Sequence, residues 1–279
     1  MNRSLIVSWN VRGLGRVEKK VVVRRCITTY KAAIVFLQET KLQLVDDRVV
    51  KRVFGNSRLS EYSFSPSSGA VGGLITVWDL NMFECLSSST HPNHILLRGE
   101  LRFQGKKLQC VLMNIYAPND GADRKELLRD IKVVLMTYNC PVFLGGDFNV
   151  VRNVKERIGN SSSKAEMTGF SKFIDSLALV DLPLAGGRFT WSSIRDVPAQ
   201  SRLDRFLLSP KCLECWPDLT QQCLPKNISD HNPIALMYHC FFGGPKPFRY
   251  FDYWTDYKDY NELIKMLASR SNLQRLARC

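Results

Sequence analysis

The chain has 279 residues and a net charge of +13, from 39 Lys and Arg against 26 Asp and Glu. Hydrophobic residues make up 45% of it, enough for a full core, which excludes a wholly disordered chain. No run of about 18 apolar residues occurs, so we expect no membrane-spanning helix and no membrane partner. Residues 1–60 hold 13 Lys and Arg against 4 Asp and Glu, and this excess favours a polyanionic partner such as nucleic acid. A solvated basic surface is the alternative explanation.

The N-terminal sequence MNRSLIVSWNVRG turns polar within about ten residues and lacks the pattern of a cleavable signal. The nine cysteines are an odd number and are spread thinly along the chain. We therefore expect reduced thiols in a protein that stays inside the cell.

Short apolar runs, several of them apolar nearly throughout, predict strands along most of the chain. In chain order the predicted strands cover 5–11, 32–39, 72–79, 94–103, 107–118, 140–149, 188–193, 201–209 and 232–239. Helical periodicity predicts helices at 17–29, 123–138 and 164–179. Gly105 in FQGKK predicts a hairpin turn between two of the strands. Strands and helices in this mixture, without strict alternation, predict an α/β (α+β) fold of two packed sheets with helices outside.

A Gly- and Pro-rich break at 241–248 predicts the end of the main domain near residue 240. We expect one domain over 1–240, followed by a linker-like segment over 241–279 with a helix at 257–276.

Polar residues stand where predicted strands begin or end. They are Asn10, Glu39, Tyr116, Asp147, Asn149, Asp204, Asp230 and His231. Each alone has a turn or cap as its simplest explanation. Together they predict one shared site, because the loops at one end of a sandwich converge. Carboxylates gathered so densely repel one another unless a cation lies among them, and hard oxygen ligands without Cys favour Mg²⁺ or Mn²⁺ over zinc.

These residue types suit the hydrolysis of phosphate esters. A metal ion polarises the phosphoryl oxygens, and a carboxylate can orient or deprotonate a water molecule. An imidazole held by a carboxylate can stabilise the charged phosphate.

Six motifs in order resemble those of the endonuclease/exonuclease/phosphatase superfamily: WNVRG, LQET, NIYAPN, GGDFN, SRLDRF and SDHNP. The resemblance covers about residues 3–240. It implies a DNase I-like four-layer α/β sandwich of two mostly antiparallel sheets flanked by helices, with the site at one end.

The resemblance also implies roles for the motif residues. Glu39 would bind Mg²⁺ with Asn10 close by, Asp147 would activate the attacking water, and Asn149 would position it. Tyr116 would contact the scissile phosphate, as would His231, which Asp230 would orient, and Asp204 would belong to the same network. Further contacts to phosphate or DNA would come from Asn119, Arg157, Thr190, Arg12 and Ser201.

Two departures from the superfamily pattern bear on the substrate. Abasic-site endonucleases usually carry an acidic residue where this chain has Arg12, and an aromatic residue where it has Ser201. Both differences argue against a pocket for a baseless sugar.

The motifs are most similar to the endonuclease domain of plant LINE-type non-LTR retrotransposons, which also have a comparable GPKPFRYFDYW segment. This resemblance implies a nuclear, monomeric enzyme that nicks one strand of double-stranded DNA to leave a 3′-hydroxyl. A reverse transcriptase domain is expected in a full-length element, and only 39 residues follow Cys240. We expect a truncated or domesticated copy, or a fragment of a longer reading frame. A catalytically idle DNA-binding remnant and a phosphatase of small phosphoesters are the alternatives.

Overall fold

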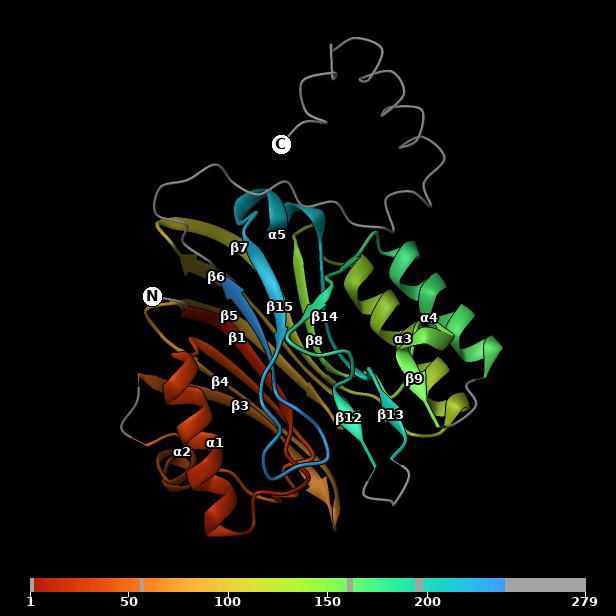
Figure 1. Ribbon diagram of the computed structural model, residues 1–279. Helices are drawn as coiled ribbons and strands as arrows, with labels where there is room; N and C mark the ends of the chain where they lie inside the picture. The colour runs from red at the N-terminus through yellow and green to blue at the C-terminus, as the bar shows by residue number, and fades with distance from the viewer. Residues whose placement is uncertain (1–2, 56–57, 160–162, 194–197, 239–279) are drawn as a thin grey trace, which may run out of the picture. The chain divides into compact units, whose positions relative to one another are not determined.

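The computed structural model describes residues 3–55, 58–159, 163–193 and 198–238. All of them belong to the unit Met1–Cys240, so the expected linker and helix of 241–279 lie outside the described residues. Two large sheets and one small sheet form the framework (Figure 1). None of the described helices is both long and apolar enough to cross a membrane.

The first large sheet has seven strands in the order β11-β15-β16-β1-β2-β4-β3. Their bounds are β1 Arg3–Asn10, β2 Ile34–Gln38, β3 Leu59–Ser68, β4 Val71–Asp79, β11 Leu184–Ala185, β15 Leu219–Cys223 and β16 Ile234–Tyr238. β1 runs parallel to β2, and β11 runs parallel to β15. The other pairings in this sheet are antiparallel.

The second large sheet has six strands in the order β10-β14-β8-β7-β6-β5. Their bounds are β5 Phe83–His91, β6 His94–Phe103, β7 Lys106–Tyr116, β8 Val142–Asp147, β10 Val180–Asp181 and β14 Asp204–Leu208. Only β7 and β8 pair in parallel in this sheet. The small sheet joins β9 Arg157–Ile158, β12 Trp191–Ser192 and β13 Gln200–Ser201.

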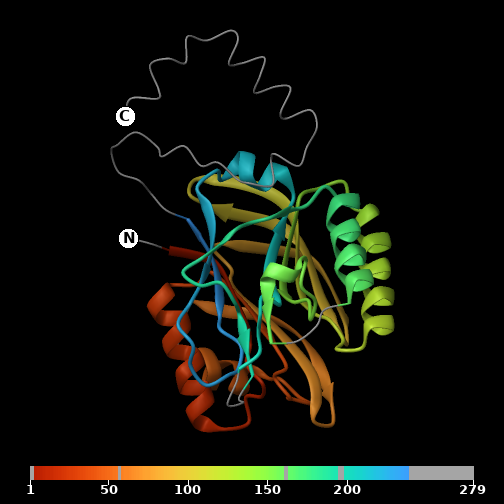
Figure 2. The same ribbon diagram turned by 45° about the vertical axis from the view of Figure 1, so that its right-hand side comes forward.

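Helices cover the outer faces of the two sheets, which makes four layers (Figures 1 and 2). Their bounds are α1 Val17–Tyr30, α2 Asp47–Phe54, α3 Gly121–Met136, α4 Lys164–Ser176 and α5 Pro210–Cys215, with a 3₁₀ turn at Val154–Glu156. One apolar cluster fills the space between the sheets, with Phe36 from the first sheet and Phe143 from the second. A second cluster packs α3 and α4 on the second sheet, and a third packs α1 and α2 on the first.

Side-chain caps set where three of the helices begin. Asp46 accepts a hydrogen bond from the backbone N–H of Val49 at the start of α2. Asp120 caps α3 in the same way, and Ser163 accepts from the N–H of Glu166 at the start of α4. Each cap satisfies a backbone donor that the helix itself leaves unpaired.

The predicted four-layer sandwich of mostly antiparallel sheets is confirmed, and so are the three predicted helices. Gln104 and Gly105 form the predicted hairpin turn, both with positive φ. The sequence did not predict α2, α5, β3, β5 and β15, nor the two-residue strands β9, β10 and β11. β3 and β5 are the edge strands of their sheets, and most residues of β5 are exposed. A strand with little buried surface carries little apolar signal in its sequence.

Candidate active site

Polar residues gather at one end of the two sheets because of how the strands are directed. Asn10 ends β1, Glu39 follows β2, Tyr116 ends β7 and Asp147 ends β8. β14 runs antiparallel to β8, so its first residue, Asp204, lies opposite Asp147 in register. Tyr116 is the register partner of Asp147 on the other side. Asp147 therefore occupies the middle of a row of three polar residues.

Asn10 joins the two sheets at this end. Its Nδ2 donates to Oε1 of Glu39 and to Oδ2 of Asp147, at 2.9 Å in each case. Its Oδ1 accepts from the backbone N–H of Arg12 at 3.2 Å, which fixes the orientation of the amide. Asn10 is fully buried. It thus holds two carboxylates at a set separation without adding charge.

Glu39 is held by its backbone as well as by Asn10. Its φ is 49°, in the left-handed region that L residues seldom adopt. Its backbone oxygen accepts from the N–H of Gly13, so the loop after β1 runs alongside the end of β2. Burial, followed by the charge of Glu39, raises the pKa of Tyr116, so its phenol stays a hydrogen-bond donor.

Asp147 and Asn149 lie at a sharp turn after β8. Asp147 Oδ1 accepts from the backbone N–H of Asn149 at 2.9 Å, and Asn149 Nδ2 donates to the backbone oxygen of Ala117 at 2.7 Å. Gly146 has a φ of +146°, and a Cβ there would lie 1.9 Å from the backbone oxygen of Ile115. The glycine before Asp147 is therefore required by the close approach of β7.

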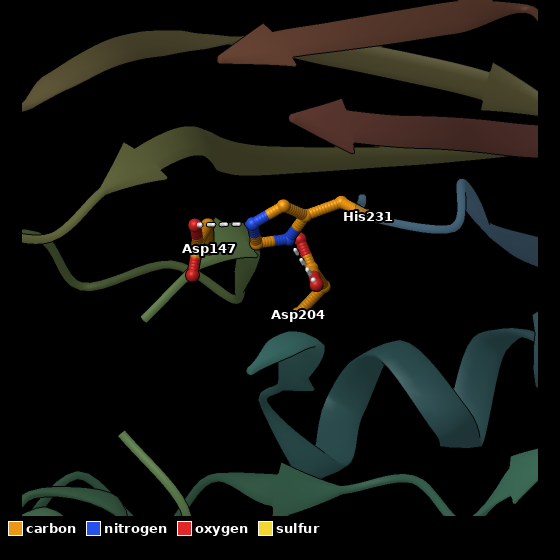
Figure 3. Close-up of side chains that lie close together, drawn as sticks. All are labelled: Asp147, Asp204 and His231. Atoms are coloured by element: carbon orange, nitrogen blue, oxygen red, sulfur yellow. Dashed lines mark hydrogen bonds and ion pairs between the residues drawn. The ribbon is translucent and has the colours of Figure 1, made fainter. Parts of the chain in front are cut away.

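His231 lies between two carboxylates, as Figure 3 shows. Its Nδ1 is 2.9 Å from Oδ2 of Asp204, and its Nε2 is 3.7 Å from Oδ2 of Asp147. Burial lowers the pKa of His231, but the charges of Asp204 and Asp147 outweigh burial and raise it to about 9. Burial, together with the charge of Asp204, raises the pKa of Asp147 to about 6, against the lowering effect of His231. At neutral pH the imidazole is thus a cation and Asp147 an anion.

The prediction that Asp230 orients His231 is wrong. Asp204 makes the hydrogen bond to the imidazole, while Asp230 accepts from Nε of Arg12 at 3.0 Å and from Nε1 of Trp191 at 2.9 Å. Asp230 lies in a bend of the backbone just before His231, so the two neighbouring side chains need not point the same way. Asp230 belongs instead to the part of the site that contains Glu39 and Arg12.

Arg12 bridges two acidic residues. Its Nε is 3.0 Å from Oδ1 of Asp230 and 3.6 Å from Oε1 of Glu39. Partial burial lowers the pKa of the guanidinium, but the charges of Glu39 and Asp230 raise it overall. Burial raises the pKa of Asp230, but the charge of His231, the hydrogen bond from Trp191 and the contacts with Arg12 together lower it.

Two of the expected substrate contacts are corrected. Thr190 is fully buried, and its hydroxyl accepts from the backbone N–H groups of Leu203 and Asp204 at 3.0 Å each. Ser201 is 1% exposed, and its hydroxyl accepts from Nε of Arg157 at 2.9 Å. Both residues support the fold around the site rather than face a substrate.

The other three expected contacts, Arg12, Arg157 and Asn119, remain accessible. Arg157 is half-buried at the start of β9. Asn119 is exposed on the loop between β7 and α3, where its backbone oxygen accepts from Arg124.

The sequence did not reveal several residues that hold the site in place. Ser229 Oγ donates to the backbone oxygen of Asn10 at 2.7 Å and accepts from the N–H of His231 at 3.1 Å. Trp9 Nε1 donates to the backbone oxygen of His231 at 3.0 Å. Only the position of Ser229 inside SDHNP and of Trp9 inside WNVRG hinted at such roles.

The charges of the site fit a divalent cation. Four carboxylates face two cationic side chains, and these six residues are Glu39, Asp147, Asp204, Asp230, Arg12 and His231. The formal charges of these six residues leave two negative charges uncompensated, the charge that one Mg²⁺ or Mn²⁺ would balance. The oxygen donors at this end are also those that such ions prefer.

Two groups of side chains could hold the ion. The ligand atoms of Asp147, Asp204 and His231 lie within 4.8 Å of one another. However, both ring nitrogens of His231 face carboxylates and its pKa is raised, so it lacks the lone pair that a metal ligand needs. The Glu39 carboxylate, 6% exposed and next to Asn10, is the better candidate.

Comparison with known proteins gives the family. The pattern of the endonuclease/exonuclease/phosphatase family matches residues 7–231. The chain belongs to this family. The family name covers nucleases and phosphatases, which hydrolyse phosphate esters, and the site described above contains the residue types for that reaction.

Two curated relatives match the sequence. The "Transposon TX1 uncharacterized 149 kDa protein" of Xenopus laevis is 27% identical over 172 residues, which are 59% of this chain and 13% of that protein. The chain therefore spans only a small part of the length of this relative. The exodeoxyribonuclease of Bacillus subtilis is 26% identical over 258 residues, covering 83% of this chain and 98% of the relative.

Solved structures share the fold. An AP endonuclease from Archaeoglobus fulgidus superposes with a TM-score of 0.65 at 16% identity, over 84% of this chain and 99% of that one. The endonuclease domain of TRAS1, a telomere-specific non-LTR retrotransposon, gives a TM-score of 0.61 at 18% identity, over 85% and 99%. At these identities the likeness shows the architecture alone.

Proposed function

We propose that the chain is a Mg²⁺-dependent DNA endonuclease that nicks one strand of a duplex and leaves a 3′-hydroxyl. The observation that carries the proposal is the pairing of a cationic and an anionic group at the end of the sheets. His231 Nε2 lies 3.7 Å from Oδ2 of Asp147. Asp204 makes a hydrogen bond to His231, and Asn10 makes one to Asp147. A phosphate and an attacking water need these opposite charges side by side.

Glu39 would hold the metal ion, with Asn10 beside it, and Mn²⁺ would serve in place of Mg²⁺. When bound, the ion polarises the phosphoryl oxygens and offsets charge that develops on them. Asn10 donates to both carboxylates through one amide nitrogen, which would fix Glu39 at the ion relative to Asp147 at the attacking water.

Asp147 would align the attacking water and take its proton. Its pKa of about 6 makes it a stronger base than an ordinary aspartate, while it remains ionised at neutral pH. Asn149, fixed by its bonds to Asp147 and Ala117, would position the water. The water oxygen bonds to phosphorus, the bond from phosphorus to the 3′ oxygen breaks, and that oxygen takes up a proton to become the 3′-hydroxyl.

His231 and Tyr116 would contact the phosphate. The imidazolium donates to a phosphoryl oxygen, and Asp204 keeps it protonated and correctly oriented. Tyr116 donates its phenolic proton from the neighbouring strand. Both donors are held before the substrate arrives, which is the condition for strong stabilisation of a transition state.

The proposal of DNA as substrate rests on charge and on relatives. The net charge of +13 suits a duplex and argues against a small phosphoester. A transposon protein and a retrotransposon endonuclease domain are among the similar proteins. A nick with a 3′-hydroxyl would prime DNA synthesis by a reverse transcriptase in a full-length element, and the nucleus is the compartment where it would act.

An end-labelled duplex tests the proposal. Incubated with the chain and Mg²⁺, it should be cut within one strand, and a DNA polymerase should extend the new end. EDTA should stop the cutting. Loss of nucleotides one at a time from an end, or ends that a polymerase extends only after phosphatase treatment, would contradict the proposed product.

A further inference from the structure

Arg12 places a fixed positive charge between two of the site's carboxylates. Its Nε lies 3.0 Å from Oδ1 of Asp230 and 3.6 Å from Oε1 of Glu39, the proposed metal ligand. A guanidinium in this position already balances part of the negative charge of Glu39 and Asp230, which a metal ion would otherwise balance.

The backbone aims the Arg12 side chain at these carboxylates. Its φ is 49°, and its N–H donates to Oδ1 of Asn10. Its backbone oxygen accepts from Nζ of Lys19 at 2.7 Å, and Lys19 also donates to the backbone oxygen of Val11 at 3.0 Å. A strained conformation held by two hydrogen bonds at Arg12 and a third at Val11 indicates a residue whose direction matters.

The Arg12 side chain is nevertheless within reach of an entering ligand. It is 42% exposed, whereas Glu39 is 8% exposed at its side chain. A guanidinium binds phosphate oxygens through two parallel hydrogen bonds, so an entering DNA phosphate competes with Asp230 and Glu39 for it.

We propose that Arg12 is a built-in counter-cation, which keeps a divalent ion weakly bound at Glu39 until a DNA phosphate draws the guanidinium away. Metal binding and DNA binding then favour each other. A bound metal ion frees Arg12 from Glu39 for a DNA phosphate, and a phosphate that binds Arg12 removes the positive charge that repels the metal ion. The inference rests on the proposed function, since it takes Glu39 as the metal ligand.

The test measures Mn²⁺ affinity by electron paramagnetic resonance, without any measurement of cleavage. Each protein carries His231→Gln to prevent cutting and is titrated alone and with a saturating short duplex. Without DNA, Arg12→Gln should bind Mn²⁺ at least ~10-fold more tightly than the parent, because a repelling charge close to the ion is gone. With DNA, the parent should gain affinity and the difference should fall below ~3-fold.

Two further variants identify the cause. Arg16→Gln removes one positive charge from the same loop at an exposed position, and it should change Mn²⁺ affinity less than ~3-fold. Arg12→Lys keeps the charge, so its Mn²⁺ affinity should stay close to that of the parent. This result would show that a change at position 12 does not by itself alter Mn²⁺ binding through misfolding.

The proposal is overturned if Arg12→Gln binds Mn²⁺ no more tightly than the parent, or if neither binds it. A chain that shows the Mn²⁺ pattern but never cuts DNA would refute the proposed function alone. A chain that cuts DNA without the Mn²⁺ pattern would refute only the role of Arg12.

Discussion

His231 and Asp204 are 27 residues apart in the chain, yet Nδ1 of the imidazole meets Oδ2 of the carboxylate at 2.9 Å. Both side chains are 1% exposed. A buried aspartate in contact with a buried histidine keeps the imidazole charged and fixes which nitrogen faces the site. The protonation of His231 is therefore the property on which the proposed chemistry depends most.

The pH dependence of turnover should be bell-shaped. Asp147, with its pKa raised to about 6, must lose its proton, so turnover rises with pH on the acid side. A bound cation lowers that pKa, so at saturating Mg²⁺ this limb should lie at or below about 6. His231, with its pKa raised to about 9, must keep its proton, so turnover falls as pH rises through about 9. Single-turnover cleavage across this range measures both limbs.

Asp204→Asn should lower the alkaline limb, and it should lower the acid limb as well, because the charge of Asp204 also raises the pKa of Asp147. Among the influences that raise the pKa of His231 the charge of Asp204 is the largest, so its removal lets burial draw the pKa back toward or below 6.5. The attraction between the Asp204 charge and the His231 cation also contributes to the free energy of unfolding. This contribution is present in full below pH 6.5 and is lost as the pH rises through about 9. An unchanged alkaline limb in the variant would show that another group controls it.

His231→Ala should cost ~10²–10³ in turnover, the usual loss for one preorganised contact to a transition state. DNA affinity should change little, because most of it comes from many phosphate contacts elsewhere. Single-turnover rates and filter binding separate the two quantities. A collapse of affinity with unchanged turnover of bound DNA would make His231 a binding residue instead.

Glu39→Gln keeps the size of the side chain and removes its charge. Turnover should fall by ~10²-fold or more and should recover only partly at high Mg²⁺. The measurement is the cleavage rate as a function of Mg²⁺ concentration, and Glu126→Gln on the exposed face of α3 serves as a control. Full activity of Glu39→Gln at limiting Mg²⁺ would remove Glu39 from the metal site.

Thr190→Val should act on stability and turnover together. The variant deprives two buried backbone N–H groups, those of Leu203 and Asp204, of their acceptor, at a cost of ~1–3 kcal/mol. Thr190→Ser keeps the hydroxyl and should unfold close to the parent. Urea unfolding gives the free energies, and equal losses in the Val and Ser variants would mean that the hydroxyl is not what matters.

Most of the layers could be predicted from the sequence. Central strands carry buried apolar runs, and the helices that cover the sheets carry a helical apolar periodicity. The sequence missed β3 and β5 because edge strands bury little, and it missed α2 because the helix is only eight residues long. The structure brings several of the motif residues together at one end of the sheets, since strand ends converge there. Their partners were not predictable. Adjacency in sequence suggested Asp230 for His231, whereas the register of β14 on β8 places Asp204 beside Asp147, where its carboxylate meets His231.

Thr190 and Ser201 show a second limit of the sequence. A small hydroxyl in a loop looks the same whether it faces a ligand or accepts a backbone N–H, and only burial tells the two apart. The bridge from Arg12 to Glu39 and Asp230 was hidden for a related reason. Its three members come from three distant loops, and a left-handed backbone at Arg12 directs the side chain.

Nicking of a supercoiled plasmid tests the central claim most directly. The chain should convert supercoiled DNA to the open-circular form with Mg²⁺ and not with EDTA, and intact DNA should be cut about as well as the same plasmid carrying abasic sites. The double variant Glu39→Gln, His231→Ala should leave the plasmid supercoiled. Cutting confined to abasic sites, or a plasmid untouched by the parent chain in Mg²⁺ and in Mn²⁺, would contradict the assignment of a DNA-nicking endonuclease.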